Sequence, residues 1–178
     1  MAQIGLKNIY YAVMTIGSGS AADSYGTPVK IGEAISVDIN PSVATNNLYG
    51  DDMAVATDTI TKEISVTIET TDISLENQAA LLGHTYSAAD GLTANMTDTA
   101  PYVALLFESD KHNGGIRCVK LMKGKFAPTQ EKIQTRGENL NYQTPSLTGT
   151  FVADKNGDWK KVKDFAKGAD TSSWYASV

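Results

Sequence analysis

The chain has 178 residues, 42% of them hydrophobic, and a net charge of −5, which is typical of one soluble globular domain. Its apolar runs are far shorter than the roughly 20 residues that span a bilayer, and no basic start precedes an apolar stretch at the N-terminus. Cys118 is the only cysteine, which excludes an internal disulfide and a zinc site built from several thiolates. We therefore expect a cytosolic protein that does not enter a membrane.

Charge is distributed along the chain in three blocks. Residues 1–30 hold two lysines and one aspartate, residues 31–110 hold thirteen acids and one base, and residues 111–178 hold twelve bases and six acids. If these blocks occupy different surfaces, copies attract one another head to tail, which gives rings or filaments. If the strands interleave, the charges average out, and the sequence leaves both arrangements open.

The first expected element is a strand over residues 6–14, LKNIYYAVM, that is apolar on both faces. Its alternate residues form two sets, Ile9, Tyr11 and Val13 on one face and Tyr10, Ala12 and Met14 on the other. Such a strand is covered on both sides, and a helix or a neighbouring subunit would serve equally well as the second cover. Residues 15–28 have the composition of a flexible connection.

Two half-buried strands then flank an unpatterned stretch. Apolar residues alternate with polar ones in residues 31–39 and 60–69, the apolar sets being Ile31, Ile35, Val37 and Ile39, then Ile60, Ile64, Val66 and Ile68. Residues 40–58 between them show neither alternation nor a helical stripe, and exceed the roughly 12 to 15 residues usual for a structureless loop. We predict a long loop at the tip of an oversized hairpin that binds another copy of the chain.

One helix is expected, in SLENQAALLG. Ser74 is a suitable N-cap, Leu75, Ala79 and Leu82 fall on one helical stripe, and Gly83 is suited to end the helix. Strands follow at YVALLFES and IRCVKLMKGKF, joined by an HNGG turn, with further candidates near Lys132 and in residues 147–153 and 159–165.

The C-terminal segment, residues 166–178, contains Trp174 and Tyr175. Both look exposed in the sequence, and aromatic residues of this kind are favoured anchors at protein interfaces. Disorder of the segment is the competing interpretation.

No catalytic constellation is present. The GSGSA run lacks the ending of a phosphate-binding loop, and His84 and His112 belong to no nucleophile signature or metal-ligand spacing. The run DKNGD at residues 154–158 fits a turn better than a calcium loop. Lysines near Trp159 and Phe165 would suit a nucleic-acid surface, but the protein as a whole is acidic. We predict no enzyme, no metal and no cofactor.

These elements predict a mainly β (α+β) fold. We expect an antiparallel β-sandwich or barrel-like single domain over residues 1–178, with one flanking α-helix and a long inter-strand loop. Residues 1–30 supply the first strand and the flexible connection, residues 40–58 the long loop and residues 166–178 the C-terminal segment.

The order of several short motifs resembles the major tail proteins, or tail tube proteins, of long-tailed bacteriophages and prophages, particularly siphophages of Gram-positive hosts. The motifs are IGLKNIYYAVM, NLYGDD, LLGHTY, APYVALLFES, GGIRCVKLMKGKFAP and LTGTFVAD, which cover residues 4–154. The resemblance implies a structural virion subunit that forms hexameric rings. These rings would stack head to tail into the hollow conduit for DNA ejection.

The resemblance also implies roles for particular residues and partners. Residues 40–58 become the loop that contacts the next ring, and the contact residues would be Leu48, Tyr49, Asp51, Asp52, Met53, Tyr10, Tyr11, Trp174 and Tyr175. An acidic lumen that lets DNA slide would draw on Asp51, Asp52, Glu63 and Glu69. The partners would be further copies and the tape measure, tail terminator and distal tail proteins, with DNA as passing cargo. The protein would be made in the host cytoplasm and reside in the virion tail.

Three alternatives remain at this stage. One is the tube of a contractile tail, a bacteriocin or a secretion-type injection particle. Another is a carbohydrate-binding β-sandwich that stacks sugars on Tyr10, Tyr11, Tyr86, Tyr102 and Trp159. The last is an enzyme, which would need a metal at His84 or His112.

Overall fold

The computed structural model describes residues 2–18, 23–130 and 144–178. Its elements, in chain order, are β1 (Lys7–Thr15), β2 (Ser24–Tyr25), β3 (Val29–Gly32), β4 (Ala34–Gly50), β5 (Met53–Thr70), α1 (Leu75–Leu82), β6 (Thr85–Ser87), β7 (Gly91–Thr93), β8 (Val103–Asp110), β9 (Ile116–Ala127), β10 (Ser146–Val152), β11 (Lys160–Phe165) and α2 (Ser172–Tyr175). The mainly β class with a flanking helix is confirmed, and the single turn α2 was not predicted. The strand expected near Lys132 lies outside the described residues.

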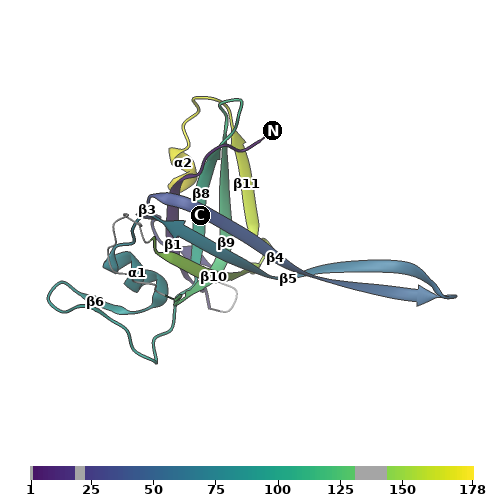
Figure 1. Cartoon of the computed structure of the whole chain (residues 1–178), viewed down its shortest axis with the longest axis horizontal. Coiled ribbons are helices and arrows are strands. Elements are labelled where there is room, and N and C mark those ends of the chain that lie inside the picture. The colour runs from purple at the N-terminus through teal and green to yellow at the C-terminus, as the bar shows by residue number, and fades with distance from the viewer. Residues whose placement is uncertain (1, 19–22, 131–143) are drawn as a thin grey trace, which may run out of the picture.

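Nine of the strands form one antiparallel sheet (Figure 1). Its path runs β2-β1-β8-β9-β10-β5-β4, with β3 paired to β1 and β11 paired to β9, while β6 and β7 form a separate hairpin. β3 and β4 are separated only by Glu33, yet β3 pairs with β1 and β4 with β5. The chain therefore crosses from one end of the sheet to the other between β3 and β4. Because this connection is so short, the two ends lie close together and the sheet has a sandwich-like curvature.

The main core lies inside this curved sheet and against α1. The aromatic side chains at its centre, Phe126 and Phe151, meet edge to face with ring centroids 5.8 Å apart. Phe151 is paired with Gly124 on β9, where an added Cβ would lie 2.4 Å from the Phe151 ring. Gly124 therefore makes room for the ring. The buried members of this core are Ile9, Tyr11, Ile31, Ile64, Val66, Ile68, Leu81, Leu82, Val103, Leu105, Phe107, Val119, Leu121, Phe126, Leu147 and Phe151.

β1 is covered on both faces, as its two-sided apolar pattern predicts. Ile9 and Tyr11 lie in the main core, and Ala12 belongs to a second cluster with Ala104 and Leu106 on the outer face of the sheet. The second cover in this chain is not α1 but the C-terminal segment, because Tyr175 packs on this outer cluster.

Three predicted strand faces need correction. Val13, predicted on the covered face of β1 with Ile9 and Tyr11, is 38% exposed. In the other two strands, irregular registers change which residues share a face. Ile35 is 44% exposed, since the pairing of β4 with β5 shifts between Ala34 and Ser36. Ile60 is 53% exposed, since one extra β5 residue lies between the pairs Pro41–Ile64 and Val43–Thr61.

α1 has the predicted caps. The Ser74 side chain accepts a hydrogen bond from the Asn77 N–H, and Gly83 adopts the left-handed conformation with φ 76°. The predicted stripe is wrong at Leu75, which is half exposed, because the helix buries Leu81 in its place alongside Ala79 and Leu82.

Candidate assembly interface

The most prominent feature of the molecule is a two-stranded ribbon that projects from its body (Figure 1). β5 pairs with β10 from Ile64 to Glu69, but from Thr61 to Met53 it pairs only with β4. We call residues 43–61 the arm. From Pro41, whose partner Ile64 is the last β5 residue toward the tip that is paired with β10, to Gly50 before the turn, the ribbon reaches ten residues beyond the body, or about 33 Å at the strand rise of about 3.3 Å per residue.

The arm is regular β structure, so the irregular loop predicted for residues 40–58 is wrong, while the oversized hairpin is confirmed. Apolar and polar residues alternate in a strand when one of its faces packs on a core. Neither face of the arm has a core to contact, so the pattern is absent there. The usable signal was instead the β-branched composition of the stretch, for example Val55, Thr57 and Thr59, which favours strands.

A two-residue turn closes the arm. Asp51 and Asp52 have φ angles of 49° and 59°, between the paired residues Gly50 and Met53. Positive φ at both central residues is the requirement of the tight turn that matches the twist of a hairpin. The two carboxylates therefore stand at the far end of the molecule, on exposed residues.

The arm exposes a concentration of large apolar side chains. Leu48, Tyr49 and Met53, the anchors predicted from the sequence, are 66%, 67% and 72% exposed. The structure adds three that the sequence reasoning missed, Val43, Val55 and Ile60. Clustered exposure of this kind marks an interaction surface, because a protein that stays alone in water gains nothing from it.

The register divides the arm into two sides. The cross-strand pairs Ala44–Ile60, Asn46–Asp58 and Leu48–Ala56 lie on one side, which is apolar except for its middle pair. The other side carries a row of threonines and one asparagine, from the pairs Thr45–Thr59, Asn47–Thr57 and Val43–Thr61.

The acids predicted for a lumen do not gather in one place. Asp51 and Asp52 stand at the tip of the arm, whereas Glu63 is exposed at its root. Glu69 is half-buried within the body and accepts hydrogen bonds from the Ser36 and Thr144 hydroxyls. The tip and the root are separated by the length of the arm.

Apart from Tyr49 on the arm, the aromatic residues predicted to contact other subunits lie in the body. Tyr11 is 4% exposed and its hydroxyl donates to Asn77 Oδ1, so this residue belongs to the core and that prediction is corrected. Tyr10 is half-buried against Tyr175, with ring centroids 4.8 Å apart. Trp174 meets the edge of Phe165. The expected exposure of Trp174 and Tyr175 is wrong, because the C-terminal segment packs on its own sheet.

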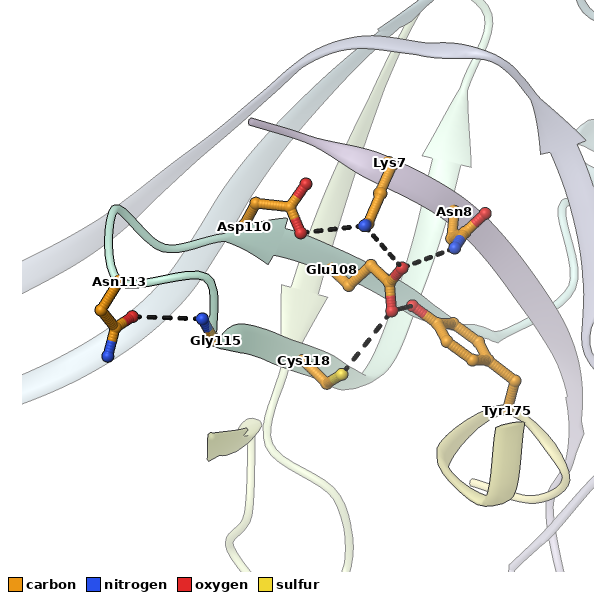
Figure 2. A network of polar contacts seen from close by, with 8 residues as sticks. All are labelled: Lys7, Asn8, Glu108, Asp110, Asn113, Gly115, Cys118 and Tyr175. Carbon is orange, nitrogen blue, oxygen red and sulfur yellow. Dashed lines mark hydrogen bonds and ion pairs between the residues drawn. The ribbon is translucent and has the colours of Figure 1, made fainter. Parts of the chain in front are cut away.

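A polar network fixes this segment to the sheet (Figure 2). Glu108, 2% exposed, accepts hydrogen bonds from Asn8 Nδ2 at 2.5 Å and from the Tyr175 hydroxyl at 3.2 Å, and Cys118 Sγ lies 3.9 Å away. Burial, followed by the nearby Glu108 carboxylate, raises the pKa of Tyr175 well above its usual value. The same causes raise the pKa of the Cys118 thiol to about 11.

Lys120 makes a second attachment. Its Nζ donates to the Ser177 carbonyl at 2.5 Å and lies 4.3 Å from the centre of the Trp174 ring. Burial lowers the pKa of this lysine, and the nearby charge of Lys161 lowers it further.

The aromatic residues considered for sugar stacking are spread over the molecule. Tyr86 lies on the small β6-β7 hairpin and Tyr102 between two lysines of β9, while Trp159 packs against the main core. With Tyr11 also in the core, these residues do not form one platform.

The histidines make local contacts. His84 Nδ1 lies 2.8 Å from Asp98 Oδ2, and the His112 backbone N–H donates to the Ala2 carbonyl. Among the described residues, no group of three or more His, Cys, Asp or Glu side chains is placed to hold a metal ion. Nor does the described part of the chain contain a helix with the length and apolarity needed to cross a bilayer.

Comparison with protein families matches residues 38–174 to the phage tail tube proteins. Among curated proteins no sequence matches the chain. The family match begins within β4 and includes the arm, the strands from β5 to β11 and most of the C-terminal segment, while β1 to β3 precede it. The chain therefore belongs to the phage tail tube protein family, whose members are structural, non-enzymatic proteins of the virion tail.

Proposed function

We propose that this protein forms six-fold rings that stack head to tail, and that the arm of each copy contacts a copy in the next ring. The observation that carries this proposal is the arm, which extends about 33 Å beyond the body and exposes six large apolar side chains. Its strands cannot cover these side chains themselves, because both sides of a ribbon face outward. A second protein surface is needed, and a tube subunit is surrounded by copies of itself.

The stacked rings would enclose the bore through which DNA leaves the capsid. Lysine and arginine side chains facing the bore would bind phosphates and retain the polymer, whereas acids would let it slide. Exposed Glu63 at the root of the arm is the acid that best fits this role, whereas Glu69 lies six residues further along β5 and is half-buried in the body. We assign Asp51 and Asp52 to contacts between copies instead, since they lie at the tip.

The remaining partners follow from the same role. The tape measure protein would occupy the bore before ejection, and the terminator and distal tail proteins would meet the two ends of the tube. Synthesis would take place in the cytoplasm of the bacterial host, and the siphophage type of tail would leave the tube without a sheath.

Negative-stain electron microscopy of the concentrated protein tests this proposal. Val43 pairs directly with Thr61, so replacing residues 44–60 by Asn-Gly closes the ribbon with a tight turn and leaves the body unchanged. We expect stacked rings or tubes from the wild type and none from the shortened protein. Tubes from the shortened protein would contradict the role of the arm, provided that both proteins unfold at the same denaturant concentration.

A further inference from the structure

The outer face of the sheet carries lysines beside the C-terminal segment. Lys161 pairs in register with Lys120, and Lys163 pairs with Cys118. Paired residues point to the same side of a sheet, and Lys120 contacts the C-terminal segment on the outer side. Lys161 and Lys163 therefore project outward from β11, and both are exposed.

Two more lysines point the same way from β9. Gly124 and Phe126 face the core, so the residues alternating with them, Lys123 and Lys125, face outward. Their Nζ atoms lie 4.8 and 4.5 Å from the centre of the Tyr102 ring. We call Lys123, Lys125, Lys161 and Lys163 the lysine face.

Asp23 lies near Lys123, but the positive charge at the Lys161 and Lys163 end of the lysine face is only weakly compensated. Lys161 lies 3.9 Å from Asp158, but both side chains are about half exposed, so water screens the attraction. Asp164, the acid within β11, is instead held by the Arg117 guanidinium through two hydrogen bonds. The surface is therefore suited to an acidic partner.

β11 is also an open edge of the sheet. In the described structure it pairs with β9 alone, and three of its six residues are lysines. A lysine-rich edge disfavours pairing with a second copy of itself, because like charges would meet, and it favours a partner of opposite sign.

The arm has the opposite charge. Residues 43–61 contain Asp51, Asp52 and Asp58 and no lysine or arginine. The turn places two of these carboxylates at the tip, beside exposed Leu48 and Tyr49. Beside the lysine face, the partly exposed ring of Tyr102 offers apolar surface to such a tip.

We infer that the lysine face receives the arm tip of a second copy, with Asp51 and Asp52 placed against Lys161 and Lys163. The inference rests on the proposed function, since it names the surface that the arm would contact. The tip cannot reach this face on its own body, because the paired ribbon holds it about 33 Å away from the sheet. Every copy supplies one arm and one lysine face, so each copy can bind one further copy through each surface. The contact therefore repeats from copy to copy and does not end in a closed dimer.

Charge exchange between the two surfaces tests the inference. Asp51→Asn/Asp52→Gly removes both charges and gives the turn the Asn-Gly pair that favours the same geometry. Lys161→Glu/Lys163→Glu reverses the lysine face, and Lys30→Glu reverses a lysine on β3 as a matched control. The last variant joins Asp51→Lys/Asp52→Lys to Lys161→Glu/Lys163→Glu in one chain, which restores opposite charges in exchanged positions.

Self-association is measured by sedimentation velocity and electron microscopy at low salt and in about 1 M salt, where the Debye length falls to roughly 3 Å. We expect the neutral tip and the reversed lysine face each to raise the concentration needed for assembly by about tenfold or more. The exchanged variant should recover most of the loss, and Lys30→Glu should behave as the wild type. Salt should weaken the wild type more than the neutral-tip variant.

The outcomes separate this contact from the proposed function. If the shortened arm abolishes tubes while Lys161→Glu/Lys163→Glu assembles normally, the arm functions in stacking and the lysine face is the wrong surface. If the exchanged variant assembles no better than Lys161→Glu/Lys163→Glu alone, the pairing of the arm tip with the lysine face is also overturned. A wild type that stays monomeric at every concentration and salt refutes both. If the lysine reversal abolishes binding of a duplex DNA oligonucleotide and leaves assembly intact, the face serves DNA instead.

Discussion

The hydroxyl of Tyr175 donates a hydrogen bond of 3.2 Å to Oε2 of Glu108, and so joins the last helical turn of the chain to a strand at the centre of the sheet. Asn8, which supplies another donor to Glu108, has a φ of 56°. Asparagine tolerates this conformation better than most residues. The buried carboxylate thus holds the first strand, the central strand and the C-terminal segment together.

Tyr175→Phe tests this attachment. The ring and its packing on Tyr10 remain, but the Glu108 carboxylate loses a donor in a buried site. We expect the free energy of unfolding to fall by about 1.5 kcal/mol in urea denaturation. Tyr86→Phe, at an exposed position, should change it by less than about 0.5 kcal/mol. Equal effects of the two substitutions would mean that the hydrogen bond to Glu108 does not stabilise the fold.

The raised pKa of Cys118 predicts a loss of folding stability at alkaline pH. Burial and the Glu108 carboxylate raise the pKa of the thiol from 9.0 to about 11 in the folded protein, so the unfolded chain loses this proton first. The contribution of the protonated thiol to the free energy of unfolding is fully present below about pH 9 and is lost as the pH rises toward 11. Cys118→Ala should therefore show a shallower fall in the free energy of unfolding over this interval. Parallel curves for the two proteins would contradict the raised pKa.

The lowered pKa of Asp164 predicts a loss of folding stability at acidic pH. Hydrogen bonds from Arg117, then from Lys111, hold the pKa of this carboxyl well below its usual 3.8. Its contribution to stability is present at neutral pH and declines as the pH falls below about 4. Asp164→Asn should lower the thermal midpoint at pH 7, and the difference from the wild type should shrink on acidification or in high salt. A difference that stays constant with pH would assign the effect to lost packing.

The arm should be separable from folding stability. Leu48→Ser and Met53→Ser change side chains that are 66% and 72% exposed, so each should shift the free energy of unfolding by less than about 0.5 kcal/mol. Both should nevertheless reduce tube formation in electron microscopy. Phe151→Ala, in the core, should cost about 3 to 5 kcal/mol. Normal tubes from the two serine variants would show that these anchors make no essential contact.

Two glycines distinguish backbone strain from crowding. Gly83 and Gly157 have φ angles of 76° and 86°, but only at Gly83 would an added Cβ meet a neighbour, the Thr99 carbonyl oxygen at 2.3 Å. Gly157→Ala should cost about 1 kcal/mol of unfolding free energy from the left-handed conformation, and Gly83→Ala clearly more. Equal costs, measured by urea denaturation, would mean that the helix end moves freely away from Thr99.

Local patterns in the sequence were sufficient for much of the body. The Ser74 and Gly83 caps, the strand that follows Pro101 and the HNGG turn were all recognisable, because capping and turn formation depend on neighbouring residues. The apolar character of both faces of β1 also identified a strand covered twice. Leu48, Tyr49 and Met53 were predicted as contact residues through the resemblance rather than through any pattern, and the structure shows that they are exposed.

The tertiary structure decided what occupies those faces and where the charges stand. The cover of β1 proved to be the C-terminal segment, through contacts between Tyr10 and Tyr175 that are separated by most of the chain. Ile35 and Ile60 are exposed because register shifts, which depend on the partner strand, changed their side of the sheet. The arm became a strand pair because backbone hydrogen bonding needs no core-facing pattern. Local composition therefore determined the kind of elements, and long-range pairing determined which surfaces they leave for other copies.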